Sequence, residues 1–185
     1  MARYRVGLET RDRILAATRD LLAQGGLEAA TLKAICEMAG ILPGSFYNLF
    51  GSKEEVVLTV VRQAITAVDP DPSGTGSDTV SDLVSAYVRF ITEEEPLARV
   101  YLRMAVGGAL TDQAMAGRVL RHHQARVTRF AEAMDRASPG AGNPLRAEAL
   151  VAALNGYALQ SLLDPGFDFA MHAERLVASE AVSAH

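Results

Sequence analysis

Apolar positions recur every three or four residues along most of this chain, the spacing of α-helices that bury one face. Short polar or glycine-containing stretches separate these segments. The first 68 residues are expected to form four helices, from Thr10 to Gly25-Gly26, Thr31 to Gly40, Pro43 to Phe50 and Ser52 to Val68, with Thr10, Thr31 and Ser52 as N-caps. Glu55 lies three residues after Ser52, as in a capping box.

A stretch rich in Pro, Gly, Ser and Asp, Asp69–Ser77, then predicts a loop. Helical spacing resumes beyond it, and we find no strand pattern and no internal repeat. Three further helices are expected to begin at Thr79 or Ser81, at Pro96, and after Asp112 as a cap. A turn is expected over residues 138–144. The last two helices are expected from Asn143-Pro144 to about Leu163 and, after a tight connection over 164–168, to about Ala181. The fold class is therefore all-α.

The third segment is short, yet it has two distinct faces. Its apolar residues share one face, and its glycine and polar residues share the other. The apolar set is Phe46, Leu49 and Phe50, and the opposite set is Gly44, Tyr47 and Asn48. The turn Gly40–Leu42 separates it from the second helix, which is helix-turn-helix spacing with the third helix in the recognition position. The exposed face is suited to DNA, because Ser45, Tyr47 and Asn48 can bond phosphate oxygens and base edges.

The charge distribution agrees with a polyanion at the N-terminal end only. Residues 1–53 carry seven Lys or Arg against five Asp or Glu, whereas residues 54–185 carry eleven against seventeen. Thr31 begins the second helix and Lys53 the fourth, where flanking phosphates would meet a hydroxyl, free N–H groups and a positive charge.

Several classes of protein find no support. The single cysteine, Cys36, excludes an intramolecular disulfide and a multi-cysteine zinc site, and we expect an inert, buried thiol. His122 and His123 diverge by about 100° on a helix, so a shared metal is not expected. There is no nucleophile elbow or phosphate loop, and hence no enzyme or cofactor is expected. Without a long apolar run or a signal peptide, the expected location is the cytoplasm.

Residues 10–55 resemble the DNA-binding domain of TetR-family transcriptional regulators. The resemblance rests on TLKAICEMAGILPGSFYNLFGSKEEV, from Thr31 to Val56, and on the first helix upstream. Three positions differ from the family pattern: Leu42 replaces a frequent Ser or Thr cap, Leu49 a common aromatic or His, and Cys36 a small Ala. The resemblance implies DNA contacts from Thr31, Leu42, Pro43, Gly44, Ser45, Tyr47, Asn48 and Lys53.

The resemblance also implies a DNA-binding domain over residues 1–53 and a helical effector-binding and dimerisation domain over 54–185. A homodimeric repressor would leave its double-stranded DNA operator when a small, largely apolar effector binds. The expected effector-binding residues are Tyr87, Ile91, Tyr101, Met104 and His122. The expected dimer interface comprises Leu150, Val151, Leu154, Tyr157, Ala158 and Leu162.

Two other classes of function stay open at this stage. The exposed face of the third helix would also suit a helical module that binds another protein. A small-molecule carrier or enzyme would use the N-terminal helices only as a scaffold. At the level of single residues, Gly44 could ease helix packing and Tyr47 could be merely structural.

Overall fold

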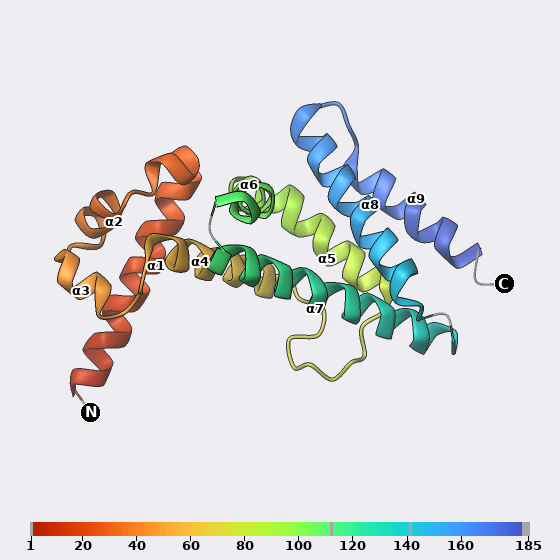
Figure 1. Cartoon of the computed structure of the whole chain (residues 1–185), viewed down its shortest axis with the longest axis horizontal. Coiled ribbons are helices and arrows are strands. Elements are labelled where there is room, and N and C mark those ends of the chain that lie inside the picture. Colours follow the sequence, from red (N-terminus) through yellow and green to blue (C-terminus); the bar gives the residue numbers. More distant parts are fainter. Residues whose placement is uncertain (1, 112, 141, 183–185) are drawn as a thin grey trace. The chain divides into compact units, whose positions relative to one another are not determined.

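The all-α prediction is confirmed. The computed structural model describes residues 2–111, 113–140 and 142–182, and this described part consists of helices and connections with no strand (Figure 1). Its helices are α1 (Ala2–Ala29), α2 (Leu32–Ala39), α3 (Pro43–Tyr47), α4 (Lys53–Ala67), α5 (Val80–Glu93), α6 (Glu95–Thr111), α7 (Gln113–Ala137), α8 (Pro144–Leu163) and α9 (Phe169–Val182). The predicted cap Asp112 lies outside the described residues.

The chain folds into two compact units. The first comprises Met1–Ile65 with Glu95–Tyr101, and the second comprises Thr66–Glu94 with the chain from Leu102 onward. Helices α4 and α6 each begin in the first unit and end in the second. The polypeptide thus crosses between the units within α4, within α6, and at the short connection between α5 and α6.

Helix α1 begins earlier than its sequence pattern predicts. It starts at Ala2, so Thr10 lies inside the helix, where its hydroxyl donates to the Val6 carbonyl at 2.8 Å instead of capping a terminus. The N-terminal extension carries no buried stripe, since Val6 is 58% exposed and Leu8 is 45% exposed. This is why apolar spacing did not reveal it. The predicted stop at Gly25-Gly26 is present as a kink with non-helical angles, and Gly26 has a φ of +65°.

The predicted caps of α4 and α5 are confirmed in geometry. The Glu55 N–H donates to Ser52 Oγ at 3.1 Å, while the Glu55 carboxylate accepts from the Gly51 N–H at 2.9 Å. Thr79 and Asp82 form a reciprocal capping box at the start of α5. Each satisfies N–H groups that a helix start leaves without partners.

In the first unit, helices α1, α2 and α3 pack around a small apolar core. Ile14, Leu22 and Ile35 are almost fully buried, and Cys36 is 4% exposed. Burial raises the pKa of the Cys36 thiol, and the nearby charge of Glu37 raises it further. The thiol therefore stays protonated near neutral pH, which agrees with an inert role.

In the second unit, α5 packs against α7 and α9, and α8 packs against α7 and α9. Helix–helix packing of this kind buries one face of each helix. The largest fully buried side chains of the unit are Phe90, Phe130, Leu150 and Leu154.

The predicted loop between α4 and α5 is tied down at both ends by arginines of α7. Arg129 donates through both terminal nitrogens to Asp69, at 3.0 and 2.6 Å, and through Nε to Asp78. Arg136 donates to the Asp78 carboxylate and to the Asp78 carbonyl, both at 2.5 Å. Inside the loop, the Asp71 carboxylate accepts the backbone N–H groups of residues 75–77. The loop is therefore a folded element despite its composition.

Candidate nucleic-acid interface

Two capping devices fix the helix-turn-helix. Thr31 caps α2, where its hydroxyl oxygen accepts the Ala34 N–H at 3.1 Å. Gly40 ends α2 in the left-handed region with φ +63°, and its N–H bonds the carbonyls of Cys36 and Glu37. A side chain at residue 40 would strain this turn. The turn thus sets the direction in which the chain enters α3.

Helix α3 is anchored through one face and exposed on the other. Phe46 is fully buried and Phe50 is 3% exposed, with their ring centroids 5.9 Å apart. The Arg11 guanidinium of α1 lies 5.3 Å from the Phe50 ring centroid, a cation–π contact that also holds this side of the helix. The exposed side chains or backbone positions are Gly44, Ser45, Tyr47 and Asn48. This is the two-faced arrangement that the sequence pattern predicts.

Helix α3 is shorter than predicted. It ends at Tyr47, and the Leu49 and Phe50 N–H groups both donate to the Phe46 carbonyl at 2.9 Å in a tight closing turn. These two hydrogen bonds direct Phe50 into the core although α3 does not continue beyond Tyr47. Leu49 is half-buried there.

The start of α3 is open on its outer side. Leu42 occupies the cap position with 77% of its surface exposed and makes no capping bond through its side chain, and Pro43 follows it, also exposed. A Cβ added to Gly44 would have no heavy atom within 4 Å. Packing within the protein therefore does not require glycine at residue 44.

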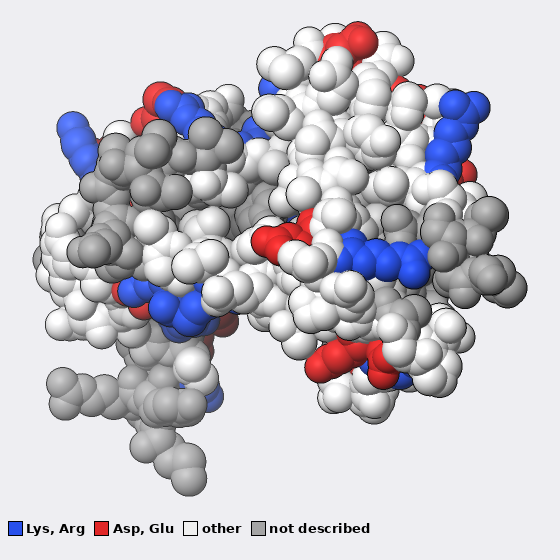
Figure 2. All heavy atoms as spheres, turned by 45° about the vertical axis from the view of Figure 1, so that its right-hand side comes forward, with Lys and Arg blue, Asp and Glu red and all other residues white. Residues whose placement is uncertain are grey.

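The charged residue predicted for this surface, Lys53, begins α4 directly after the Ser52 cap and is partly exposed. Elsewhere, basic side chains are dispersed: on the face shown in Figure 2, Lys and Arg form small separate groups rather than one continuous patch. Helix α3 itself contains no charged side chain. Any contact of α3 and its cap residue Asn48 with DNA would therefore use hydroxyl, amide and backbone groups.

The residues predicted to bind an effector do not all come together. Tyr87 and Ile91 of α5 and Met104 of α6 are buried in the second unit, and His122 of α7 is partly buried there. Tyr101 belongs to the first unit.

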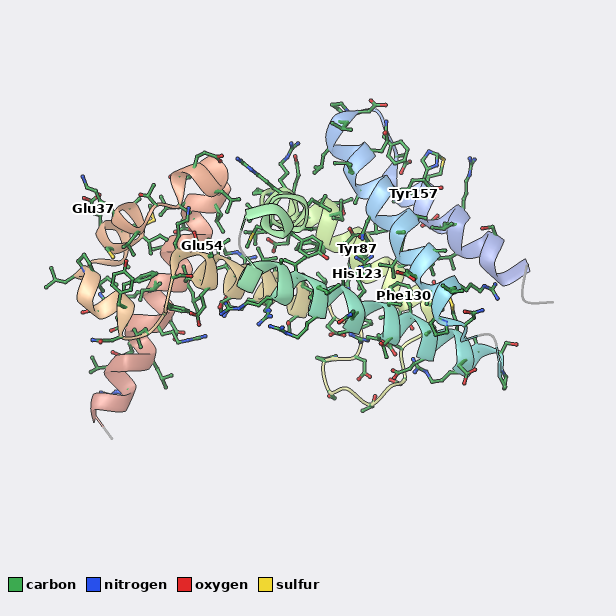
Figure 3. All side chains as sticks on the ribbon, viewed as in Figure 1. Glu37, Glu54, Tyr87, His123, Phe130 and Tyr157 are labelled. Carbon is green, nitrogen blue, oxygen red and sulfur yellow. The ribbon has the colours of Figure 1, made fainter. Side chains whose placement is uncertain are left out.

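Around Tyr87 the structure places groups that sequence reasoning missed. Arg126 of α7 lies over the ring of Tyr87, which is labelled in Figure 3, at 3.9 Å from the ring centroid. Both residues bond Asn155 of α8. The Tyr87 ring also meets Phe169 edge-on, with centroids 5.8 Å apart. The available signal was a charge within an apolar stripe, since Arg126 lies one turn before buried Phe130.

The residues predicted for a dimer interface lie mainly inside the protomer. Leu150, Val151, Leu154 and Ala158 are at most 2% exposed and form the core contact of α8 within its own unit. Tyr157 and Leu162 are partly exposed. The protomer itself thus covers Leu150, Val151, Leu154 and Ala158, so this face of α8 is not available to a second copy. The predicted choice of interface face is corrected accordingly. The exposed face of α8 carries another apolar stripe, formed by Leu145, Ala149, Ala152, Gly156, Leu159 and Leu163.

Within the described ranges, no group of three or more His, Cys, Asp or Glu side chains is arranged to hold a metal ion. The helices of the described part include none with the length and apolarity needed to cross a membrane.

Comparisons with known proteins agree with this geometry. Residues 14–60 match the model of the family described as bacterial regulatory proteins, tetR family. The HTH-type transcriptional regulator UidR of Escherichia coli K12 is 41% identical over 54 residues, which are 29% of this chain and 28% of UidR.

Solved structures extend the similarity of fold to nearly the whole chain. SmeT, the repressor of the Stenotrophomonas maltophilia multidrug efflux pump SmeDEF, superposes with a TM-score of 0.69 at 22% identity, covering 95% of this chain and 91% of SmeT. The multidrug binding protein EbrR, solved with imidazole, gives a TM-score of 0.64 at 22% identity, covering 91% and 93% of the two chains. The family is one of regulators, in agreement with the expectation that the chain is not an enzyme. Residues 14–60 of this chain therefore carry the helix-turn-helix domain of the tetR family of bacterial regulatory proteins, and nearly the whole chain shares the all-helical fold of these solved structures.

Proposed function

We propose that this regulator is a homodimeric repressor that reads a double-stranded DNA operator with α3 and leaves it when a small, largely apolar effector binds. The observation that carries the proposal is the two-faced α3. Its buried phenylalanines fix a helix whose outer face offers a glycine, hydroxyls and an amide. Such groups bond phosphates and base edges when a rigid support aims them at the major groove.

The proposed DNA-contact residues are those expected from the sequence. Tyr47 lies on the exposed face of α3, Asn48 is the exposed residue that caps its end, and Gly44 leaves room for a close approach of the backbone. Thr31 and Lys53 mark the starts of α2 and α4, where helix N-termini attract phosphate. We assign the DNA-binding role to residues 1–53 and the effector and dimer roles to residues 54–185.

A second copy is proposed to pack on the exposed stripe of α8. From Leu145 to Leu163 the stripe is about 27 Å long at the rise of an α-helix. Leu145 is 73% exposed and Leu163 is 71% exposed, while alanine and glycine between them allow close helix approach. A dimer brings two copies of α3 to one duplex, and two recognition helices bind more tightly than one.

Effector control would act by population shift. The effector is proposed to bind within the second unit and to favour a dimer conformation whose recognition helices no longer match successive major grooves. Helices α4 and α6 are the covalent routes for this coupling, because each continues from one unit into the other. A repressor so built loses affinity for DNA as effector concentration rises.

The test is a selection of duplexes from random-sequence DNA with the purified protein, followed by binding measurements by fluorescence anisotropy. The proposal expects enrichment of an inverted repeat and saturable binding that weakens as salt concentration rises. Failure to enrich any sequence, together with capture of a protein by the same face of α3, would favour a protein-interaction module instead.

A further inference from the structure

Arg126 stands out in the second unit because its guanidinium lies against two buried aromatic rings. Its guanidinium carbon lies 3.9 Å from the Tyr87 ring centroid and 5.9 Å from that of Phe130. Figure 3 labels these two aromatic residues. Nη1 donates to Asn155 Oδ1 at 2.9 Å, and the Tyr87 hydroxyl donates to the same oxygen at 3.1 Å. Helices α5, α7 and α8 thus converge on one cation.

No described carboxylate balances the charge of Arg126. Nη2 is buried and has no hydrogen-bond acceptor among the described residues. Nor does any described carboxylate lie within 4.0 Å of this guanidinium, whereas Arg129, three residues further along α7, pairs with two. A buried donor without a partner lowers stability, and an unpaired buried charge lowers it more.

The contacts that Arg126 does make hold the side chain in place without neutralising it. Stacking on Tyr87 fixes the plane of the guanidinium, and Asn155 supplies one neutral acceptor. Phe130 is 2% exposed and Tyr87 is 8% exposed, so both rings that the guanidinium contacts are buried. An oriented arginine with a buried, unsatisfied donor beside aromatic rings is suited to a carboxylate, whose two oxygens match the guanidinium fork.

We propose that Arg126 is the anion-binding residue of the effector site, and that the effector is a monocarboxylate with an apolar body. The inference rests on the proposed function, in which the second unit binds the effector, and it specifies the chemical class. The carboxylate accepts from Nη2, while the apolar body lies against aromatic side chains such as Tyr87. Binding supplies the missing counter-charge, so its free energy includes the relief of an unfavourable state of the free protein.

The experiment compares carboxylates with neutral matched compounds. Isothermal titration calorimetry is run on full-length protein with decanoate and 2-naphthoate, and with their primary amides. We expect at least one carboxylate to bind about tenfold or more tightly than its amide, because charge-assisted hydrogen bonds are the stronger ones. Arg126→Met, which keeps the apolar stem, should abolish that preference. Arg121→Met, at an exposed position of the same helix, should retain it.

Thermal unfolding without ligand separates this role from a structural one. Removing an unbalanced charge should leave the melting temperature of Arg126→Met equal to or above that of the wild type. A lower melting temperature with an unchanged preference would overturn the proposal, as would wild-type protein that binds neither carboxylate or does not distinguish acid from amide. Should Arg126→Met not fold, Arg126→Lys serves instead, and its loss of most of the preference supports the role of the planar fork.

The same samples keep the two proposals apart. DNA binding by anisotropy is measured without any carboxylate. Protein that binds its selected DNA but shows no acid preference refutes the anion site and leaves the repressor proposal standing. Protein with an Arg126-dependent preference that binds no DNA refutes the repressor proposal and supports the anion site.

Discussion

The exposed ring of Tyr47 stands edge-on against the buried ring of Phe46, with centroids 5.6 Å apart and planes at 86°. The ring of Tyr47 therefore has a fixed base although 57% of the residue is exposed. Tyr47→Phe keeps this packing and deletes only the hydroxyl. We expect the free energy of unfolding to change by less than about 0.5 kcal/mol, as for other surface changes.

The same variant should bind DNA about tenfold less tightly, since a hydrogen bond to a charged phosphate contributes roughly 1.5–3 kcal/mol. Anisotropy with the selected duplex measures the affinity, and urea denaturation measures stability. Equal affinity of Tyr47→Phe and the wild type would remove the hydroxyl from the interface.

Gly44→Ala separates close approach from internal packing. The added methyl group meets open space, and alanine favours a helix by about 0.5–1 kcal/mol over glycine, so stability should be equal or higher. DNA affinity should fall, because the methyl group keeps the backbone of α3 away from the duplex. Gly40→Ala is the contrasting control: its φ of +63° makes alanine cost about 1–2 kcal/mol there. Undiminished DNA binding by Gly44→Ala would show that the approach is not close.

Lys53→Ala tests the phosphate contact at the start of α4. We expect weaker binding to all duplex sequences and a plot of log affinity against log salt concentration whose slope is shallower by about one unit. Arg62→Ala, at an exposed position further along the same helix, should leave the slope unchanged. If both variants behave alike, Lys53 contributes only general charge.

Asp69 and Arg129 predict how acid affects the second unit. The hydrogen bonds from Arg129 are the main cause that lowers the pKa of Asp69, and the Asp71 N–H contributes further. The resulting stabilisation is complete above the unfolded pKa of Asp, near 3.9. It is lost as pH falls through the lower folded pKa.

Asp69→Asn should therefore lower stability at neutral pH and weaken its dependence on pH below about 4. Urea denaturation at a series of pH values measures both effects. Identical pH profiles for Asp69→Asn and wild type would mean that the pair contributes nothing to folding.

The exposed stripe of α8 predicts the oligomeric state. Ala152→Arg places a charge at its centre, so the protein should become monomeric with its melting behaviour at low concentration preserved. Gln124→Arg, at an exposed position of α7, should leave the oligomeric state unchanged. Sedimentation velocity over a range of concentrations distinguishes the states. A dimer that survives Ala152→Arg would place the interface elsewhere.

Sequence reasoning predicted most of what local chemistry determines. Ser52 and Thr79 cap their helices because their hydroxyl oxygens reach N–H groups three residues on. Phe46 is buried because it lies on the apolar face of α3, and Phe50 is buried, as its apolar spacing predicts, through the tight turn that closes the helix.

The missed features depend on packing between distant segments. Helix α8 is apolar on two faces, and helical spacing does not say which of them faces the chain's own core. For that reason Leu150 and Leu154 were assigned to an interface although the protomer buries them. The contacts of Arg126 were not predicted, because its partner Asn155 lies 29 positions away in the sequence.

The loop after α4 has a consequence for how the protein folds. Its closing bonds join Arg129 to Asp69 and Asp78 over 60 and 51 residues of sequence. Contacts of such separation form only after the intervening chain has lost most of its freedom. A stretch rich in proline and glycine thereby acquires its shape late, on a template supplied by α7. An isolated peptide of the loop residues is not expected to keep the shape of the loop. In the folding chain, an ordered loop indicates that α7 has already docked.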